Sequence, residues 1–279
     1  MIANARMYAV TPAVAALWKQ LFEGVARKSG AALDIVDHPP PKPIADLWQR
    51  SDKAAVFMCG LPFSLAEPRP ALVAAPVPEH GKATYWTDLV VAADSPFRRI
   101  EDTLGKRIAF TTTESQSGFA APLHFLMGMA RDEPLYDEVV APAITPVGAV
   151  LAVAEGRAEV APLDSYALAL MRRYAPDLAA RVRTIASTKR TAIPPLVASD
   201  QANEPIVAAL LSAHINKDLA PILADLLLLR FERPDVAGYD ALRRDFGATT
   251  EFWRHHRFCR SAHPVFAALQ AEPAGAKEE

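Results

Sequence analysis

The stretch RIAFTTTESQSGFAAPLHFL, residues 107–126, passes from a strand pattern to a helix pattern across one polar turn. Its first residues, 107–112, are mostly apolar or β-branched, which is typical of a buried strand. A run of apolar residues at helical spacing then continues from 118 to 130. Hydroxyl side chains and a glycine lie between the two segments. The stretch therefore predicts one strand–turn–helix unit.

The same alternation of strand-like and helix-like segments extends in both directions. We expect further strands at 5–10, 32–37, 54–59, 71–76, 88–93, 138–142, 158–163, 182–187 and 195–199. We expect further helices at 12–28, 43–50, 146–156, 164–174, 203–213, 217–231 and 235–246. Strands that alternate with helices form βαβ units, so the sequence predicts an α/β fold with mainly parallel sheets flanked by helices.

Two such series follow one another, which predicts two lobes. The first series ends near 93, and the second runs from there to about 190. The C-terminal part is mostly helical and is expected to pack back on the first series. The predicted lobes are therefore 1–93 plus 196–279, and 94–195, joined by two crossover segments at a hinge. A small ligand would bind in the cleft between the lobes.

The composition excludes several classes of protein. Of the 279 residues, 51% are hydrophobic and 22% are charged, as in an ordinary folded domain. The 30 Lys and Arg are nearly balanced by 32 Asp and Glu, so the chain lacks the basic excess expected of a nucleic-acid-binding protein. Two cysteines cannot form a disulfide framework. No apolar run reaches the roughly 18 residues of a membrane span, so none is expected.

The N-terminal segment could be an export signal or folded chain. Arg6 precedes the apolar run MYAVTPAVAALW (7–18), but no small-residue cleavage site follows that run. Thr11 followed by Pro12 instead has the pattern of a helix start, with Thr11 as the N-cap. We therefore expect a strand, a turn and a helix here and no export signal, which leaves the cellular location open.

The polar turn within 107–126 is the best local candidate for a ligand site. Ser115, Ser117 and Gly118 would lie at the start of the helix. The first amides of a helix have no partner inside it, and with hydroxyls beside them they can bind phosphate, phosphonate, sulfonate or carboxylate. Ordinary N-capping by Ser115 or Ser117 explains the same residues. On this segment alone, capping is the stronger interpretation.

Two further positions follow predicted strands. Asp164 ends the strand in AEGRAEVAPLDSYALAL (154–170), at the strand end where ligands bind in open α/β sheets. It could meet a cationic part of a ligand there, or it could cap the next helix. In VFMCGLPF (56–63), Gly60 could let a ligand approach the backbone closely. Cys59 is expected to be a small buried residue rather than a nucleophile.

Catalytic and metal-binding patterns have little support in the sequence. The motifs HExxH, GxGxxG, GxxxxGK(S/T) and GxSxG are absent. His255, Cys259 and His263 would align on one face of a helix, but structural zinc sites usually carry paired ligands from separate turns. We expect a surface helix with an aromatic face there. The sequence therefore predicts no catalytic residue, no metal and no cofactor.

Four segments together resemble one family. They are MYAV (7–10), CGLPF (59–63), ESQSGFAAP (114–122) and AVAEGRAEVAPLDSYALAL (152–170). In this order they resemble the phosphate/phosphonate-binding proteins of ABC transporters, which have the two-lobed type II periplasmic binding fold. The resemblance implies that the Ser-rich turn binds the oxyanion and that an aromatic residue and an acid line the cleft. The ligand-binding residues that it implies are Tyr8, Cys59, Gly60, Tyr85, Ser115, Gln116, Ser117, Gly118 and Asp164.

The resemblance implies a monomeric solute-binding protein that closes over a small oxyanion, phosphonate-like or phosphate-like, for an ABC-type uptake system. Its partners would be that anion and, if the chain is exported, an ABC permease. An amine on the ligand would suit Asp164. Two alternatives stay open: a cytoplasmic enzyme on the same fold, similar to some menaquinone-pathway enzymes, and a cytoplasmic ligand-sensing module.

One departure from the resemblance concerns the ligand. Many relatives carry a Gly-Ser-His stretch at the start of the helix that precedes the AEGRA segment. This chain has ITPVGAV (144–150) instead, with Pro146 near the expected position of the histidine. One polar ligand contact of the relatives would therefore be missing here.

Overall fold

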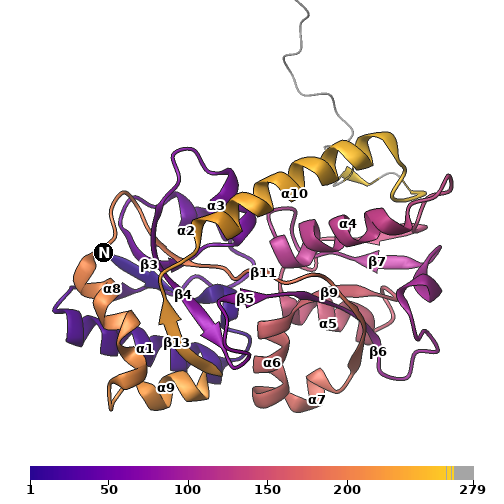
Figure 1. Ribbon diagram of the computed structural model, residues 1–279. Helices are drawn as coiled ribbons and strands as arrows, with labels where there is room; N and C mark the ends of the chain where they lie inside the picture. The colour runs from indigo at the N-terminus through magenta and orange to yellow at the C-terminus, as the bar shows by residue number, and fades with distance from the viewer. Residues whose placement is uncertain (262, 265, 267–279) are drawn as a thin grey trace, which may run out of the picture.

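The computed structural model describes residues 1–261, 263, 264 and 266. Within these residues two groups of strands lie on the two sides of the molecule, and a short ladder crosses between them (Figure 1). The ladder pairs β5 (Thr84–Tyr85) with β11 (Thr191–Ala192) in antiparallel orientation. The chain passes from one lobe to the other at these two strands.

The sheet of the first lobe contains six strands of the described chain, in the order β13-β4-β12-β3-β1-β2. Parallel pairing joins β1 to β2 and to β3, whereas β12 and β13 run antiparallel to their neighbours. The strands are β1 (Ile2–Asn4), β2 (Asp34–Ile35), β3 (Lys53–Phe57), β4 (Ala71–Pro78), β12 (Leu196–Ala198) and β13 (Leu228–Glu232).

The second lobe is built on an antiparallel sheet in the order β10-β6-β9 and on the parallel pair β7-β8. A parallel bridge from Ile108 to Val160 connects these two parts. The strands are β6 (Thr87–Ala92), β7 (Arg107–Ala109), β8 (Glu138–Val140), β9 (Ala161–Asp164) and β10 (Val182–Ser187).

Helices flank the sheets of both lobes, and α10 (Val236–His255) runs along both of them (Figure 1). Those of the first lobe are η1 (Arg6–Tyr8), α1 (Pro12–Ser29), α2 (Ala45–Gln49), α3 (Gly60–Leu65), α8 (Glu204–Leu211), η5 (Ala213–Ile215) and α9 (Ala220–Asp225). Those of the second lobe are η2 (Ile100–Thr103), η3 (Gln116–Ala120), α4 (Ala121–Leu126), η4 (Met127–Met129), α5 (Pro146–Ala154), α6 (Ser165–Tyr174) and α7 (Pro176–Ala179).

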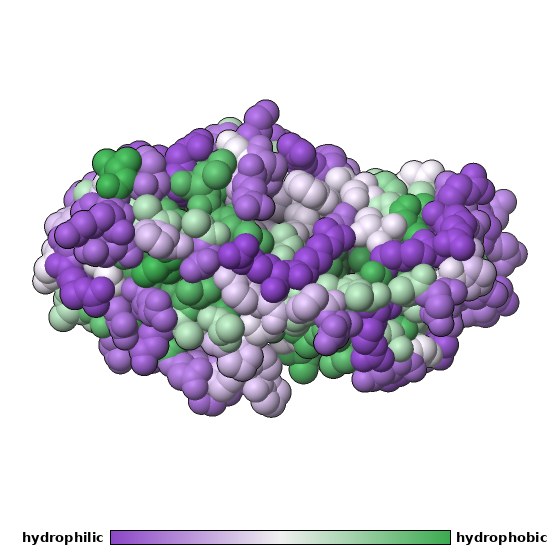
Figure 2. All heavy atoms as spheres, turned by 90° about the horizontal axis from the view of Figure 1, so that it is seen from below, coloured by the Kyte–Doolittle hydropathy of each residue, from purple (hydrophilic) through white to green (hydrophobic). Residues whose placement is uncertain are grey.

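The surface is mixed in character on the face that Figure 2 shows. Hydrophilic side chains are scattered over this whole face, with smaller groups of hydrophobic side chains between them. Among the helices of the described chain, none combines the length and the apolar character that crossing a membrane requires.

The start of α1 follows the predicted pattern. Thr11 Oγ1 accepts a hydrogen bond from the Val14 amide at 3.2 Å, and Pro12 occupies the first helical position. This geometry satisfies an amide that the helix itself leaves without a partner. The helix therefore begins shortly after the loop that carries Tyr8.

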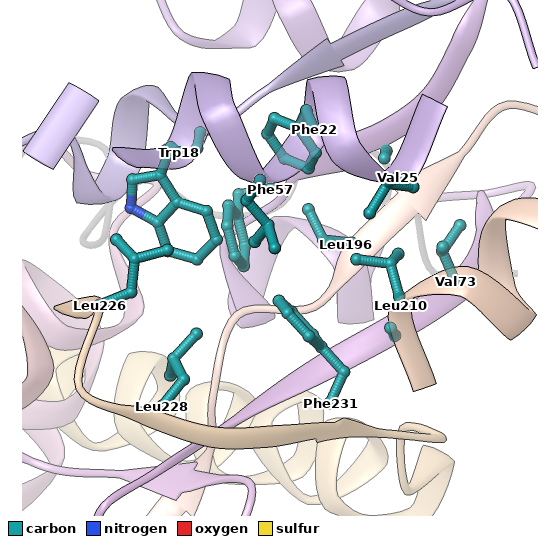
Figure 3. Close-up of a cluster of buried hydrophobic side chains, with 14 of the residues drawn as sticks. Trp18, Phe22, Val25, Phe57, Val73, Leu196, Leu210, Leu226, Leu228 and Phe231 are labelled. Atoms are coloured by element: carbon teal, nitrogen blue, oxygen red, sulfur yellow. The ribbon is translucent and has the colours of Figure 1, made fainter. Parts of the chain in front are cut away.

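The hydrophobic core of the first lobe lies between α1 and the sheet. Trp18, Phe22 and Val25 point from α1 toward apolar side chains of the strands, among them Phe57 of β3 (Figure 3). The rings of Trp18 and Phe57 meet edge to face, with centroids 5.0 Å apart. This packing holds α1 in place over the sheet.

The directions of the strands correct the prediction of mainly parallel sheets. Only β1-β2, β1-β3 and β7-β8 are parallel among the named strand pairs of the described chain. The segments 71–92 and 182–198 each carry three consecutive strands without a helix between them. Strands of the same segment do not pair with one another; each pairs with a strand that is distant in the sequence, β12 with β3 and β4, and β6 with β9 and β10. Their directions therefore follow from how the chain crosses between the two groups of strands.

Three predicted elements were wrong in type or extent. The strand expected at 5–10 is the shorter β1, which ends at Asn4 and is followed by η1. The helix expected at 217–231 ends at Asp225, and the rest forms β13, because a short apolar run suits a buried strand as well as a helix. The last helix continues to His255 and ends there, so Cys259 does not continue its face.

The proposed lobe boundaries stay a prediction. The first lobe is expected to include 196–279, of which 267–279 lies outside the described residues. The expected boundary at 93 assigns β6 to the first lobe, yet β6 pairs with β9 and β10 of the second. The pairing of β6 therefore favours crossings at β5 and β11.

Candidate functional site

A cavity of about 910 Å³ lies where the two lobes meet. Its walls come from the segments that follow β1, β3 and β7, from the end of β9, and from the starts of α1 and α5. Six of the nine sequence-predicted ligand residues line it: Tyr8, Cys59, Ser115, Ser117, Gly118 and Asp164.

The two serines of the polar turn have different roles in the structure. Ser115 is the N-cap of η3, and its Oγ accepts a hydrogen bond from the Gly118 amide at 2.9 Å. Ser117 is 8% exposed; its backbone carbonyl accepts from Thr87 Oγ1 at 2.9 Å, and its hydroxyl lies beside Tyr85. The capping interpretation thus holds for Ser115. Ser117 does not cap η3 and lines the cavity.

Gly118 leaves no room for a larger residue. A Cβ atom at this position would lie 1.8 Å from Thr111 Oγ1 and 2.9 Å from Ser115 Oγ. The close approach of Thr111 therefore requires glycine, and it brings a third hydroxyl to the turn.

Cys59 connects the two lobes through its thiol. Its Sγ accepts a hydrogen bond from the Gln116 amide at 3.1 Å, which joins the loop after β3 to the start of η3. Burial raises the pKa of the thiol to about 11, although the hydrogen bonds from nearby amides oppose the shift. Such a thiol is a poor nucleophile at neutral pH, in agreement with the sequence-based prediction.

Iodoacetamide is expected to alkylate Cys59 about 100-fold more slowly in the folded protein than in the denatured protein at pH 8. The reason is that a pKa of about 11 instead of 9.0 leaves about 100-fold less thiolate. Mass spectrometry of a Cys259→Ser variant, which keeps Cys59 as its single thiol, measures this rate. Equal rates in the two states would contradict the buried position of Cys59.

Asp164 lies at the end of β9 and caps α6. Its Oδ1 accepts hydrogen bonds from the amides of Tyr166 and Ala167, both at 2.9 Å. Burial raises the pKa of the carboxyl to about 7, and these amides and the hydroxyl of Tyr8 oppose the shift. The capping interpretation is therefore confirmed. The same carboxyl also lines the cavity and is close to Tyr8.

Three buried hydroxyls lie near the Asp164 end of the cavity, where Tyr8 interacts with Asp164 and Tyr85 with Ser117. Tyr8 Oη, Tyr85 Oη and Thr111 Oγ1 are buried and make no well-formed hydrogen bond within the described part of the chain. Burial raises the pKa of both tyrosines well above its usual range, so both are neutral donors at physiological pH. A buried hydroxyl without a partner is unfavourable by about 1–3 kcal/mol. An oxyanion bound at this end could accept from such groups.

Three predicted residues do not line the cavity. A Cβ on Gly60 would lie 2.6 Å from Leu242 Cδ1, so this glycine allows α10 to pack closely. Tyr85 is buried beside Ser117, whose hydroxyl lowers its pKa against the larger effect of burial. Gln116 lines a smaller cavity of about 150 Å³ next to α10.

The sequence analysis missed one wall of the cavity, which the segment 35–48 forms. Asn4 Nδ2 donates to Val36 O at 2.8 Å, and Arg6 Nη1 donates to Lys42 O, so the loop after β1 holds this segment. The run PPPKP (39–43) was the available signal, because several prolines in one loop restrict its backbone.

Solved structures share the fold at low sequence identity. A binding protein component of an ABC phosphonate transporter from Pseudomonas aeruginosa is 16% identical with a TM-score of 0.76, over 96% of this chain and 93% of that chain. A Prochlorococcus marinus protein in complex with methylphosphonate is 14% identical with a TM-score of 0.75, over 90% and 97%. A malate-bound protein from Rhodopseudomonas palustris is 14% identical with a TM-score of 0.57, over 90% and 98%.

These similarities show the two-lobed type II periplasmic binding fold, which confirms the predicted fold class apart from the strand directions. No curated protein matches the sequence. The family model described as "ABC transporter, phosphonate, periplasmic substrate-binding protein" matches residues 12–239, most of the chain. The chain therefore belongs to the phosphonate-binding family of periplasmic substrate-binding proteins of ABC transporters.

Proposed function

We propose that this protein binds a small organic oxyanion of the phosphonate or phosphate class between its lobes and delivers it to an ABC permease. The observation that supports this most strongly is the group of hydroxyls at one end of the cavity. Ser117, Tyr8 and Thr111 line the cavity and Tyr85 is buried beside Ser117. The hydroxyls of Tyr8, Tyr85 and Thr111 make no well-formed hydrogen bond in the described chain. Family membership supports the transport role and the phosphonate class.

Neutral donors can supply the affinity. A hydrogen bond to a charged group contributes about 1.5–3 kcal/mol, so three or four of them can reach micromolar affinity after the entropic cost of association. Such a site needs no lysine or arginine in contact with the anion, which fits the net charge of −2. The enzyme and sensor alternatives have no comparable support, because the family is one of transport binding proteins.

Ser117→Ala is expected to weaken phosphonate binding by about 10- to 100-fold, because it removes one hydrogen bond to a charged ligand. Isothermal titration calorimetry with methylphosphonate measures the loss. Thr113→Ala is the matched control, since Thr113 is an exposed hydroxyl of the same turn that does not line the cavity. An unchanged affinity for Ser117→Ala in the folded protein would remove Ser117 from the site.

The pH dependence of binding is expected to report whether Asp164 faces the ligand. Its pKa of about 7 makes it neutral below that pH and ionised above it. An alkyl phosphonate without an amine should lose affinity as the pH rises through 7, because it then meets a carboxylate. An aminoalkyl phosphonate should gain affinity, because its ammonium group then meets an opposite charge.

Calorimetry from pH 5.5 to 8.5 on the wild type and on Asp164→Asn measures this dependence. The ratio of the two affinities cancels the titration of the ligand itself. The same trend for both kinds of ligand would mean that Asp164 acts only as the cap of α6.

A further inference from the structure

The cavity continues from the hydroxyl end along α1. The residues of α1 and its N-cap that line it include Thr11, Ala15, Ala16, Lys19 and Phe22. They recur at helical spacing over 11 residues, which corresponds to about 16 Å at 1.5 Å per residue. The two alanines leave space on this face of the helix. We call this part of the cavity the α1 groove.

The opposite wall of the α1 groove is apolar and held in place. It includes Ile35, Val36 and the prolines of the run 39–43. Besides the bonds from Asn4 and Arg6, the His38 ring donates to Pro43 O at 2.8 Å and closes the segment on itself. The wall is therefore built by contacts that exist before any ligand binds.

The charged residues of the groove are exposed or half-buried. Lys19, Asp37 and Lys42 are exposed, and Arg6 is half-buried with its guanidinium on the backbone of Lys42. Ala15, Ala16 and the prolines of 39–43 are exposed as well, so the α1 groove is open to solvent, and most of its lining is alanine, proline and branched aliphatic side chains. Binding of an apolar group to such a surface is favourable, because it removes apolar atoms of both partners from water.

The cavity is much larger than an inorganic oxyanion needs. A five-atom anion occupies the room of only a few water molecules, each about 30 Å³ in the liquid. A volume of about 910 Å³ lies near the upper end of the roughly 300–1,000 Å³ found for ligand pockets. The hydroxyl end is therefore only part of this open cavity, and the α1 groove is another part.

We infer that the α1 groove holds an extended apolar substituent of the ligand, so that the substrate class is alkyl or aryl phosphonates rather than inorganic phosphate or methylphosphonate. This inference rests on the proposed function. The phosphonate group lies at Ser117 and the hydroxyl end, and the substituent lies between α1 and the segment 35–48.

A series of methyl-, butyl- and octylphosphonate, titrated by calorimetry, tests the inference. Affinity is expected to rise about fourfold for each methylene that enters the groove. Affinity that stays flat or falls from methyl to butyl would overturn the inference and leave the proposed function intact. Failure of all three phosphonates to bind would instead contradict the proposed function.

Ala16→Trp fills the groove and makes the test specific to it. It should weaken octylphosphonate binding at least tenfold and change methylphosphonate binding less than twofold. Ala13→Trp is the matched control, because Ala13 is exposed on the same helix and does not line the cavity. Equal octylphosphonate affinity for both variants would overturn the inference, and Ala16→Leu repeats the comparison if the tryptophan impairs folding.

Discussion

Asp164→Asn is expected to raise the free energy of unfolding by roughly 3–4 kcal/mol at pH 8 and to change it little at pH 4. Burial raises the pKa of this carboxyl from 3.8 to about 7. The folded protein therefore favours the neutral carboxyl. This contribution to stability is present below pH 4, is lost between pH 4 and pH 7, and stays lost above pH 7. Asparagine is neutral at every pH, so the variant does not lose this stability above pH 4.

Urea denaturation at both pH values measures this difference. The asparagine side chain keeps an oxygen that can accept from the amides of α6, so the substitution preserves the cap itself. Asp235→Asn is the matched control, because Asp235 also caps a helix, accepting from the Ala237 amide at 3.1 Å, but is exposed. A pH-independent effect of Asp164→Asn would show that the carboxyl is not held in a desolvated environment.

Gly118→Ala is expected to reduce the free energy of unfolding by about 1–3 kcal/mol and to abolish measurable phosphonate binding. The new Cβ would lie 1.8 Å from Thr111 Oγ1, so the polar turn or Thr111 must move. Either movement displaces Ser117 from the cavity wall. Thermal denaturation and calorimetry with methylphosphonate measure the two effects.

Thr111→Ala combined with Gly118→Ala should recover part of the lost stability, because the clashing oxygen is then absent. Recovery stays incomplete, since Thr111 Cβ and Ser115 Oγ each lie only 2.9 Å from the new atom. Gly247→Ala is the control, because nothing lies within 4 Å of its Cβ position in the middle of α10. If Gly118→Ala bound methylphosphonate like the wild type, the close packing of this turn would not be required for the site.

Helix starts could be predicted from the sequence, because capping residues and prolines act on the backbone next to them. The N-cap and proline at Thr11-Pro12 correctly marked the start of α1. Strand direction was not local information, because the antiparallel pairs join strands that are distant in the sequence, such as β12 with β3 and β6 with β9. The LLLL run before Arg230 was ambiguous for a related reason. Its pairing with β4, which lies far earlier in the chain, decides that it forms β13.

The site could be predicted from the sequence where a single segment contained both a polar turn and the hydroxyl side chains that could bind an anion. Ser115 and Ser117 were found from a single motif, but only the structure shows that Ser115 is the capping residue and Ser117 is not. Gly60 was assigned to the ligand because its contact partner, Leu242, lies far away in the chain. Thr111 and the wall at 35–48 were missed for the same reason, since their meeting depends on tertiary packing.

A crystal structure of the protein with methylphosphonate would test the central claim most directly. We expect a tetrahedral anion at the hydroxyl end of the cavity, within hydrogen-bond distance of Ser117 Oγ and Tyr8 Oη, and lobes closed around it. An anion bound elsewhere on the chain, or no density in the cavity at saturating concentration, would contradict the account.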